Sequence, residues 1–135
     1  MEVVHHPDSV VVVAVEGDEI VLVRQTRLGA GGQTLELPAG CLEKGETPKQ
    51  AAARELREEC GLSASSWRKL GSFWAAPDYS TEYVHVFEAT GLAEAGAARL
   101  DEDEDVVPER RPVARVLTEL SDAGSLAALA LWRAA

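Results

Sequence analysis

The stretch GCLEKGETPKQAAARELREECGL, residues 40–62, carries the strongest structural signal in the chain. It predicts a helix that begins at Thr47, whose hydroxyl can cap the helix. Pro48 suits the first helical position, and Gln50 can complete a capping box. Gly61 predicts the end of the helix, because glycine adopts without strain the left-handed conformation that follows many helices.

Three carboxylates share one face of this helix. Glu55, Glu58 and Glu59 are spaced i, i+3, i+4, so their side chains project from the same side. Like charges at this spacing destabilise an isolated helix by about 0.2–0.5 kcal/mol per pair. Clustered carboxylate oxygens are the ligands that Mg²⁺ and Mn²⁺ prefer. The pattern therefore predicts a divalent metal site, with a solvated acidic helix as the alternative.

The spacing of the fixed residues in this stretch resembles the signature of the Nudix hydrolases. The matching positions are Gly40, Glu46, Arg54, Glu55, Leu56, Glu58, Glu59, Gly61 and Leu62. The resemblance implies metal-dependent hydrolysis of a nucleoside diphosphate linked to a further group X. It also implies an α/β fold, the Nudix α/β/α sandwich with a mixed central sheet, whereas periodicity alone predicts only α+β.

Composition narrows the class of protein. A chain of 135 residues fits a single domain, 1–135. The net charge of −10 argues against a nucleic-acid partner, and bound metal ions would reconcile it with an anionic pyrophosphate substrate. No apolar run reaches the roughly 20 residues of a membrane helix, and the start MEVVHHPDS does not resemble a signal peptide. We therefore expect a cytoplasmic protein in which Cys41 and Cys60 are reduced thiols, and we assign Cys41 no role.

The rest of the chain predicts strands on either side of the central helix and a second helix near the end. A glycine-rich loop is expected at 27–33, and an alanine-rich loop at 91–98. The expected strands are 9–15, 19–24, 34–37, 67–75 and 82–89, followed by 112–120 as a strand leading into a helix and 121–133 as an amphipathic helix.

Several stretches outside the signature resemble the ADP-ribose pyrophosphatase branch of the family. They are residues 23–27, 36–40 and 76–78, with Glu82 downstream, and the acidic run 102–105. Pro77 stands 15 residues beyond Leu62, a position characteristic of that branch. The resemblance implies cleavage of ADP-ribose to AMP and ribose 5-phosphate. Two alternatives stay open: a house-cleaning nucleoside triphosphate pyrophosphatase, and a nucleotide sensor without hydrolysis, which would be expected to lack a signature carboxylate.

The resemblance also implies roles for individual residues. Two or three Mg²⁺ (or Mn²⁺) ions would be held by Glu55, Glu58, Glu59, Glu104 and the carbonyl of Ala39. Glu102 would be the base that activates water, with Glu58 the next candidate, and Arg54 would orient a carboxylate such as Glu46. Arg27, Glu36 and Pro77 would lie on the substrate side. A solvated loop is the alternative for the acidic run, and an ordinary surface position is the alternative for Arg27 and Glu36.

The N-terminal region leaves the oligomeric state open. Longer ADP-ribose pyrophosphatases exchange an N-terminal strand region between protomers, and here about nine residues precede the first expected strand. Whether the protein is a homodimer, and which group X is, therefore stay open. Trp67, Trp74 and Tyr79 are aromatic residues that would either stack on a base or pack in the core. The adjacent His5 and His6 are not expected to form a metal site, because neighbours on a strand point to opposite faces.

Overall fold

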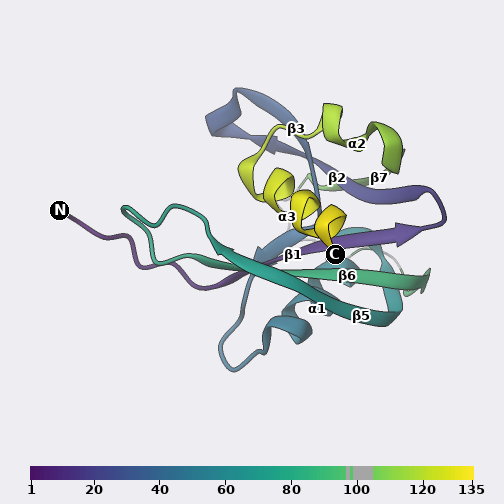
Figure 1. The fold of residues 1–135 in the computed structure, drawn as a ribbon, viewed down its shortest axis with the longest axis horizontal. Coiled ribbons are helices and arrows are strands. Elements are labelled where there is room, and N and C mark those ends of the chain that lie inside the picture. Colours follow the sequence, from purple (N-terminus) through teal and green to yellow (C-terminus); the bar gives the residue numbers. More distant parts are fainter. Residues whose placement is uncertain (97, 99–104) are drawn as a thin grey trace.

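The structure is a computed structural model that describes residues 1–96, 98 and 105–135 (Figure 1). These residues form a mixed seven-stranded sheet and three α-helices, as the α/β prediction requires. The strands are β1 (Ser9–Glu16), β2 (Glu19–Arg27), β3 (Gly32–Glu36), β4 (Ala39–Cys41), β5 (Leu62–Trp74), β6 (Tyr83–Glu94) and β7 (Val107–Pro112). The helices are α1 (Pro48–Cys60), α2 (Val113–Glu119) and α3 (Ala123–Ala134), with a short 3₁₀ turn, η1 (Leu28–Ala30), between β2 and β3.

Strand β1 organises the sheet, whose main order is β3-β2-β1-β6-β5. It pairs antiparallel with β2 near their shared hairpin and parallel with β6 along most of its length. Its first residues also pair with the short strand β4, so that Ser9 lies opposite Cys41 and Val11 opposite Ala39. This pairing brings the first residues of the signature stretch against the start of β1.

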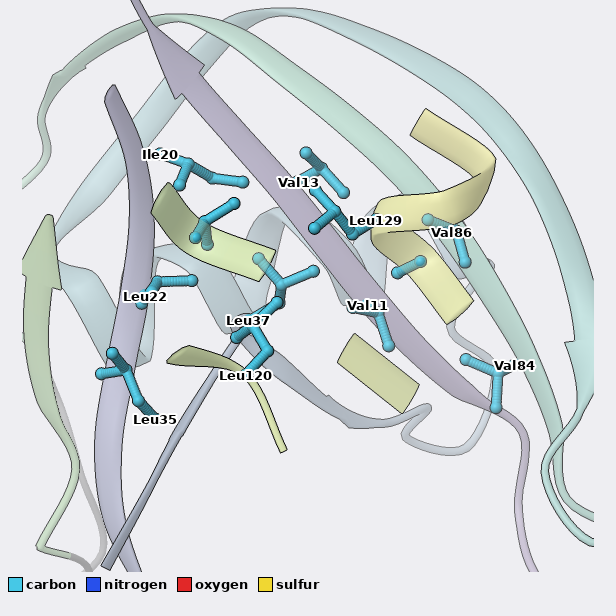
Figure 2. Close-up of a cluster of buried hydrophobic side chains, with 12 residues drawn as sticks. Val11, Val13, Ile20, Leu22, Leu35, Leu37, Val84, Val86, Leu120 and Leu129 are labelled. Carbon is cyan, nitrogen blue, oxygen red and sulfur yellow. The ribbon is translucent and has the colours of Figure 1, made fainter. Parts of the chain in front are cut away.

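The two faces of β1 belong to two hydrophobic clusters. Val11 and Val13 pack with Leu129 of α3 in the cluster shown in Figure 2. Val10 and Val12 belong to the opposite cluster, which contains Leu56 of α1. A strand buried on both faces has no need of polar alternation, which explains the continuous valine run. Helices therefore cover both faces of the sheet, as the expected sandwich requires.

Helix α1 has the predicted boundaries. The Thr47 hydroxyl accepts a hydrogen bond from the Gln50 amide, and the Gln50 side chain accepts one from the Thr47 amide, so both halves of the capping box are present. Gly61 follows the helix at φ 66°, in the left-handed region where glycine is favoured. Because Leu56 is buried in the core beneath the helix, the orientation of the carboxylate face is fixed.

Three local expectations need correction. The expected loop at 91–98 is wrong up to residue 94, because β6 continues to Glu94 and pairs with the start of β5. The strand expected to begin at Pro112 instead ends there, and α2 follows at once. In the stretch expected as a loop at 27–33, β2 runs to Arg27 and β3 already begins at Gly32.

The N-terminal segment lies beside the loop that joins β5 and β6, away from the helices (Figure 1). The amide of Val4 donates to the Tyr79 carbonyl at 2.6 Å, and the amide of His6 donates to the Thr81 hydroxyl at 2.9 Å. These contacts hold His6 close to the start of β6. The histidine pair expected on a strand therefore lies just before the first strand.

Candidate active site

A cleft of about 880 Å³ opens between the signature stretch, the start of β1 and the first residues of α3. Its lining includes six of the residues that the sequence singles out: Arg27, Ala39, Arg54, Glu55, Glu58 and Glu59. Glu36 contributes indirectly by holding Arg27. Pro77 is exposed in the connection between β5 and β6 and is not part of the lining, while Glu102 and Glu104 lie outside the described residues.

Arg54 connects the loop before α1 to the carboxylates on the helix. Its Nε and Nη2 donate to the two carboxylate oxygens of Glu46 at 2.8 and 2.9 Å, which is the contact expected from the sequence. Its Nη2 also donates to the Cys41 carbonyl at 2.9 Å. The hydrogen bonds that Arg54 donates to Glu46 raise the pKa of Arg54 above its ordinary value, so the guanidinium is a permanent cation. With only 14% of its side chain exposed, Arg54 is a fixed part of the cleft wall.

Two of the three helix carboxylates meet on one nitrogen of this arginine. Nη1 of Arg54 donates to Glu55 at 2.8 Å and to Glu58 at 3.2 Å. Gly40 makes room for the first of them, because a Cβ at Gly40 would lie 2.2 Å from Oε1 of Glu55. Only glycine at position 40 therefore allows the Glu55 carboxylate its present place beside the β4 backbone.

Glu59 has a different environment from Glu55 and Glu58. It is 6% exposed, and its carboxylate accepts a hydrogen bond of 3.0 Å from the backbone amide of Ala39. Within the described ranges, no three His, Cys, Asp or Glu side chains are arranged closely enough to hold a metal ion. All three glutamates do line the cleft, and Glu55 and Glu58 converge on a cation that the chain itself supplies.

On another wall of the cleft, Arg27 at the end of β2 is held by Glu36 at the end of β3. Two parallel hydrogen bonds of 2.9 and 3.0 Å join the guanidinium to the carboxylate, and the Thr34 hydroxyl donates to the same carboxylate. Burial acts to raise the pKa of Glu36, but the hydrogen bonds from Arg27 and Thr34 outweigh it and keep that pKa below its ordinary value. Both groups are charged at neutral pH. The Arg27 side chain is 51% exposed and so presents its charge to the cleft.

The structure also brings into the cleft residues for which the sequence predicts no role in the site. The Ser9 hydroxyl, buried at the start of β1, donates to Glu82 at 2.5 Å, and His6 and Cys41 lie beside this pair. In the sequence, Glu82 resembles a position of the ADP-ribose pyrophosphatase branch, but no role in the site is expected for it. Ser9 and His6 carry no local signal, because they reach the cleft through pairing with residues more than 30 positions away.

The three aromatic residues considered for base stacking separate into two groups. Trp67 packs against the core cluster on the α1 side of the sheet. Trp74 and Tyr79 are 56% and 53% exposed, and neither lines the cleft. Stacking inside the cleft by any of these three is therefore not supported, and Phe73 is the aromatic side chain that the described lining does contain.

A mixed sheet between helices, with a glutamate-rich helix face bordering a cleft, is the architecture expected from the signature. The chain belongs to the Nudix family, since the NUDIX domain model matches residues 5–129. It is similar to the ADP-ribose pyrophosphatases of Bacillus subtilis (strain 168), with 44% identity over 107 residues, and of Mycobacterium tuberculosis (strain ATCC 25618 / H37Rv), with 46% identity over 105 residues. These alignments cover 78% and 76% of this chain but 58% and 51% of the relatives, so the chain spans little more than half their length.

A solved structure of an ADP compounds hydrolase has a similar fold. It superposes with a TM-score of 0.85 at 28% sequence identity, covering 94% of this chain and 71% of that one. Across the part of the chain that the structure describes, no helix has the length and apolar character needed to cross a membrane.

Proposed function

We propose that this chain hydrolyses the pyrophosphate bond of a nucleoside diphosphate linked to a group X, with ADP-ribose as the first candidate, giving AMP and ribose 5-phosphate. The observation that carries the proposal is the convergence of Glu55 and Glu58 on Arg54 at the wall of a cleft of about 880 Å³. The names of the relatives, ADP-ribose pyrophosphatase and ADP compounds hydrolase, support the choice of substrate.

The donor set fits divalent metal ions of the Mg²⁺ or Mn²⁺ type. Glu55, Glu58, Glu59 and the carbonyl of Ala39 would hold them, with Glu104 joining once substrate is bound, and we propose two or three ions. Carboxylate and carbonyl oxygens are the ligands such ions prefer, and two of these carboxylates already share one positive charge. When bound, the ions would neutralise the phosphate oxygens and lower the pKa of a bound water.

Two arginines of the cleft would orient the carboxylates and bind the substrate phosphates. Arg54, anchored by Glu46, fixes the direction in which Glu55 and Glu58 point. Arg27, held by Glu36, presents a cation to the cleft, and a guanidinium binds phosphate oxygens well. For the base that takes the proton from the attacking water we propose Glu102, with Glu58 as the next candidate, because a carboxylate can act as a general base once it is within hydrogen-bond distance of that water. Pro77, outside the cleft, would shape the loop before β6.

A substrate panel tests the proposal. The purified protein is incubated with Mg²⁺ and ADP-ribose, NADH, diadenosine polyphosphates, GDP-mannose or dGTP, and the products are separated by chromatography. We expect ADP-ribose to give AMP and ribose 5-phosphate with the highest kcat/KM. The variant Glu55→Gln, prepared in the same way, controls for a contaminating hydrolase. Faster release of dGMP and pyrophosphate from dGTP would favour the triphosphate alternative, and tight nucleotide binding without any product would favour the sensor.

A cytoplasmic location and a homodimer are also proposals. Cell fractionation tests the first, and sedimentation equilibrium of the purified chain tests the second.

A further inference from the structure

Helix α3 borders the cleft with its first turn, although the proposed hydrolysis assigns the helix no role. Asp122, Ala123, Gly124 and Ser125 all line the cleft. Ser125 is 2% exposed, and its hydroxyl oxygen accepts a hydrogen bond of 2.9 Å from the backbone amide of Leu37. Leu37 is itself 1% exposed, so the bond joins two buried groups that are 88 positions apart in the chain. A buried serine therefore ties α3 to the backbone just before β4.

Three consecutive residues at this point of the chain are each bonded to a different element. The Leu37 amide is bonded to α3, as described above. The carbonyl of Pro38 accepts a hydrogen bond of 2.9 Å from the amide of Val12 in β1. The amide of Ala39 donates to the Glu59 carboxylate of α1 at 3.0 Å. The turn that leads into β4 is therefore held between α3, β1 and α1.

The pairing of β4 with β1 decides the direction of the Ala39 carbonyl. In an antiparallel pair, residues that exchange both backbone bonds with the partner strand alternate with residues that direct both groups away from it. The Pro38 carbonyl points toward β1, so the polar backbone groups of Ala39 point away from β1. The bond from the Ala39 amide to Glu59 agrees with this direction. The Ala39 carbonyl, which we propose as a metal ligand, therefore lies on the side of α1.

Removal of the Ser125 hydroxyl would leave the Leu37 amide without its acceptor in buried surroundings. A buried donor without a partner costs free energy, so the backbone would shift until the amide reaches water or another acceptor. Proline has a fixed φ, so fewer backbone rotations at Pro38 can absorb this shift before it reaches Ala39. The position of the Ala39 carbonyl therefore depends on a side chain of α3.

We propose that Ser125 is a positioning residue for the metal site: by holding the Leu37 amide, it aligns the turn so that the Ala39 carbonyl and the Glu59 carboxylate face a divalent ion together. The metal ligands in this proposal rest on the proposed function, whereas the bond between Ser125 and Leu37 stands on its own. Removing a group that orients a metal ligand from behind lowers metal affinity by about 10–100-fold. We expect the lower limit, about tenfold, because Ser125 acts two residues away from Ala39.

Binding of Mn²⁺ to the protein without substrate, followed by the loss of the electron paramagnetic resonance signal of free Mn²⁺, tests the proposal. Ser125→Ala removes the acceptor, and Ser125→Thr keeps a hydroxyl; Ser125→Cys, whose sulfur is a weak acceptor, replaces the alanine variant if that variant does not fold. Leu129→Val is the matched control, because Leu129 of the same helix packs in the same core cluster as Leu37 (Figure 2) and the hydrogen bond stays in place.

The four proteins should separate by metal affinity and not by stability. We expect the dissociation constant for Mn²⁺ to rise about tenfold in Ser125→Ala and to stay near the wild-type value in Ser125→Thr and Leu129→Val. Thermal unfolding shows whether Ser125→Ala and the Leu129→Val control are destabilised alike. An unchanged dissociation constant in Ser125→Ala, an equal rise in Ser125→Thr, or an equal rise in the control would overturn the role of Ser125.

Hydrolysis of ADP-ribose gives a second readout. Ser125→Ala should need about tenfold more Mn²⁺ for half-maximal rate, while kcat at saturating Mn²⁺ and KM for ADP-ribose stay within about twofold of wild type. A fall in kcat that saturating Mn²⁺ does not restore would contradict a role in positioning the metal ligands. If all variants bind Mn²⁺ and none hydrolyses ADP-ribose, the proposed function fails, and the dissociation constants alone decide the role of Ser125. A wild-type protein that does not bind Mn²⁺ would overturn the metal site and the role of Ser125 with it.

Discussion

Replacing Gly40 with alanine tests whether the position of one carboxylate controls the site. The added Cβ would lie 2.2 Å from Oε1 and 2.3 Å from Cδ of Glu55, closer than atoms can approach. Gly40 is not in the left-handed region, so alanine brings no backbone strain of its own. The Glu55 side chain has to move by about 1 Å or more to restore ordinary van der Waals contact. Its 2.8 Å hydrogen bond to Arg54 is then lost or lengthened.

The size of the effect follows from this displacement. A hydrogen bond to a charged group contributes about 1.5–3 kcal/mol, and both side chains are mostly buried, at 14% and 13% exposure. Because Arg54 keeps its two bonds to Glu46, we expect a loss of about 1–2 kcal/mol in the free energy of unfolding. For a domain of this size, that lowers Tm by roughly 3–8 °C. Displacing a catalytic group by 1 Å can cost about 10²-fold in rate, so kcat/KM for ADP-ribose should fall by that order.

Thermal unfolding and steady-state kinetics with Mg²⁺ measure both effects. Gly29→Ala is the matched control, because a Cβ there meets nothing within 4 Å. That variant should keep wild-type kinetics and gain at most about 0.4–1 kcal/mol of stability. A double-mutant cycle with Glu55→Ala isolates the cause: once the glutamate is gone, Gly40→Ala should cost nothing further. Wild-type kcat/KM and Tm in Gly40→Ala, or full additivity in the cycle, would refute the reasoning.

Three further predictions concern carboxylates. Glu59→Gln keeps an acceptor for the Ala39 amide but removes the charge, so the Mg²⁺ concentration for half-maximal rate should rise steeply; an unchanged Mg²⁺ titration would contradict this. Folding lowers the pKa of the Glu36 carboxyl from its ordinary value of about 4.5, so the ionised carboxylate stabilises the protein above that pH and this stabilisation is lost as the pH falls through the lowered pKa. Glu36→Gln should therefore flatten the Tm–pH curve between pH 6 and 2. Identical curves for the variant and the wild type would exclude this contribution of Glu36. Glu102→Gln should lower kcat by about 10²–10⁴-fold with little change in metal affinity. Glu104→Gln should instead raise the metal concentration needed for half-maximal rate. Full kcat in Glu102→Gln at saturating substrate and metal would show that Glu102 is not the base, and Glu58 would be the next candidate.

The parts of the structure that depend on neighbours in sequence could be predicted. The caps of α1 are decided by residues within four positions of each other, so Thr47, Gln50 and Gly61 were sufficient to locate both ends. The contact between Arg54 and Glu46 was expected from the resemblance, and it too is close in sequence, because Glu46 directly precedes the N-cap Thr47 and Arg54 lies on the helix that follows. The class of fold came from the resemblance, since alternation and helical periodicity do not specify which strands pair.

The parts that depend on distant pairing could not be read from the residues. Nothing local indicates that Ala39–Cys41 pairs with Ser9–Val11, or that the segment containing His6 lies beside Thr81. Strand β7 pairs with β2 across more than 80 positions, and its boundary at Pro112 was placed at the wrong end because proline is compatible with either end of an edge strand. The Ser9–Glu82 pair and the neighbourhood of Cys41 follow from such pairings.

The cleft combines contacts between residues close in sequence with contacts that depend on distant strand pairing. The signature stretch supplies the Arg54 network from residues close in sequence, so a similar network is expected wherever the stretch occurs intact. The wall formed by His6, Ser9 and Glu82 is assembled by strand pairing, and its side chains can change without disturbing α1. Differences in the group X should therefore arise mainly from that wall. Exchanging its residues should alter substrate preference, while substitutions in the Arg54 network should abolish turnover for every substrate alike.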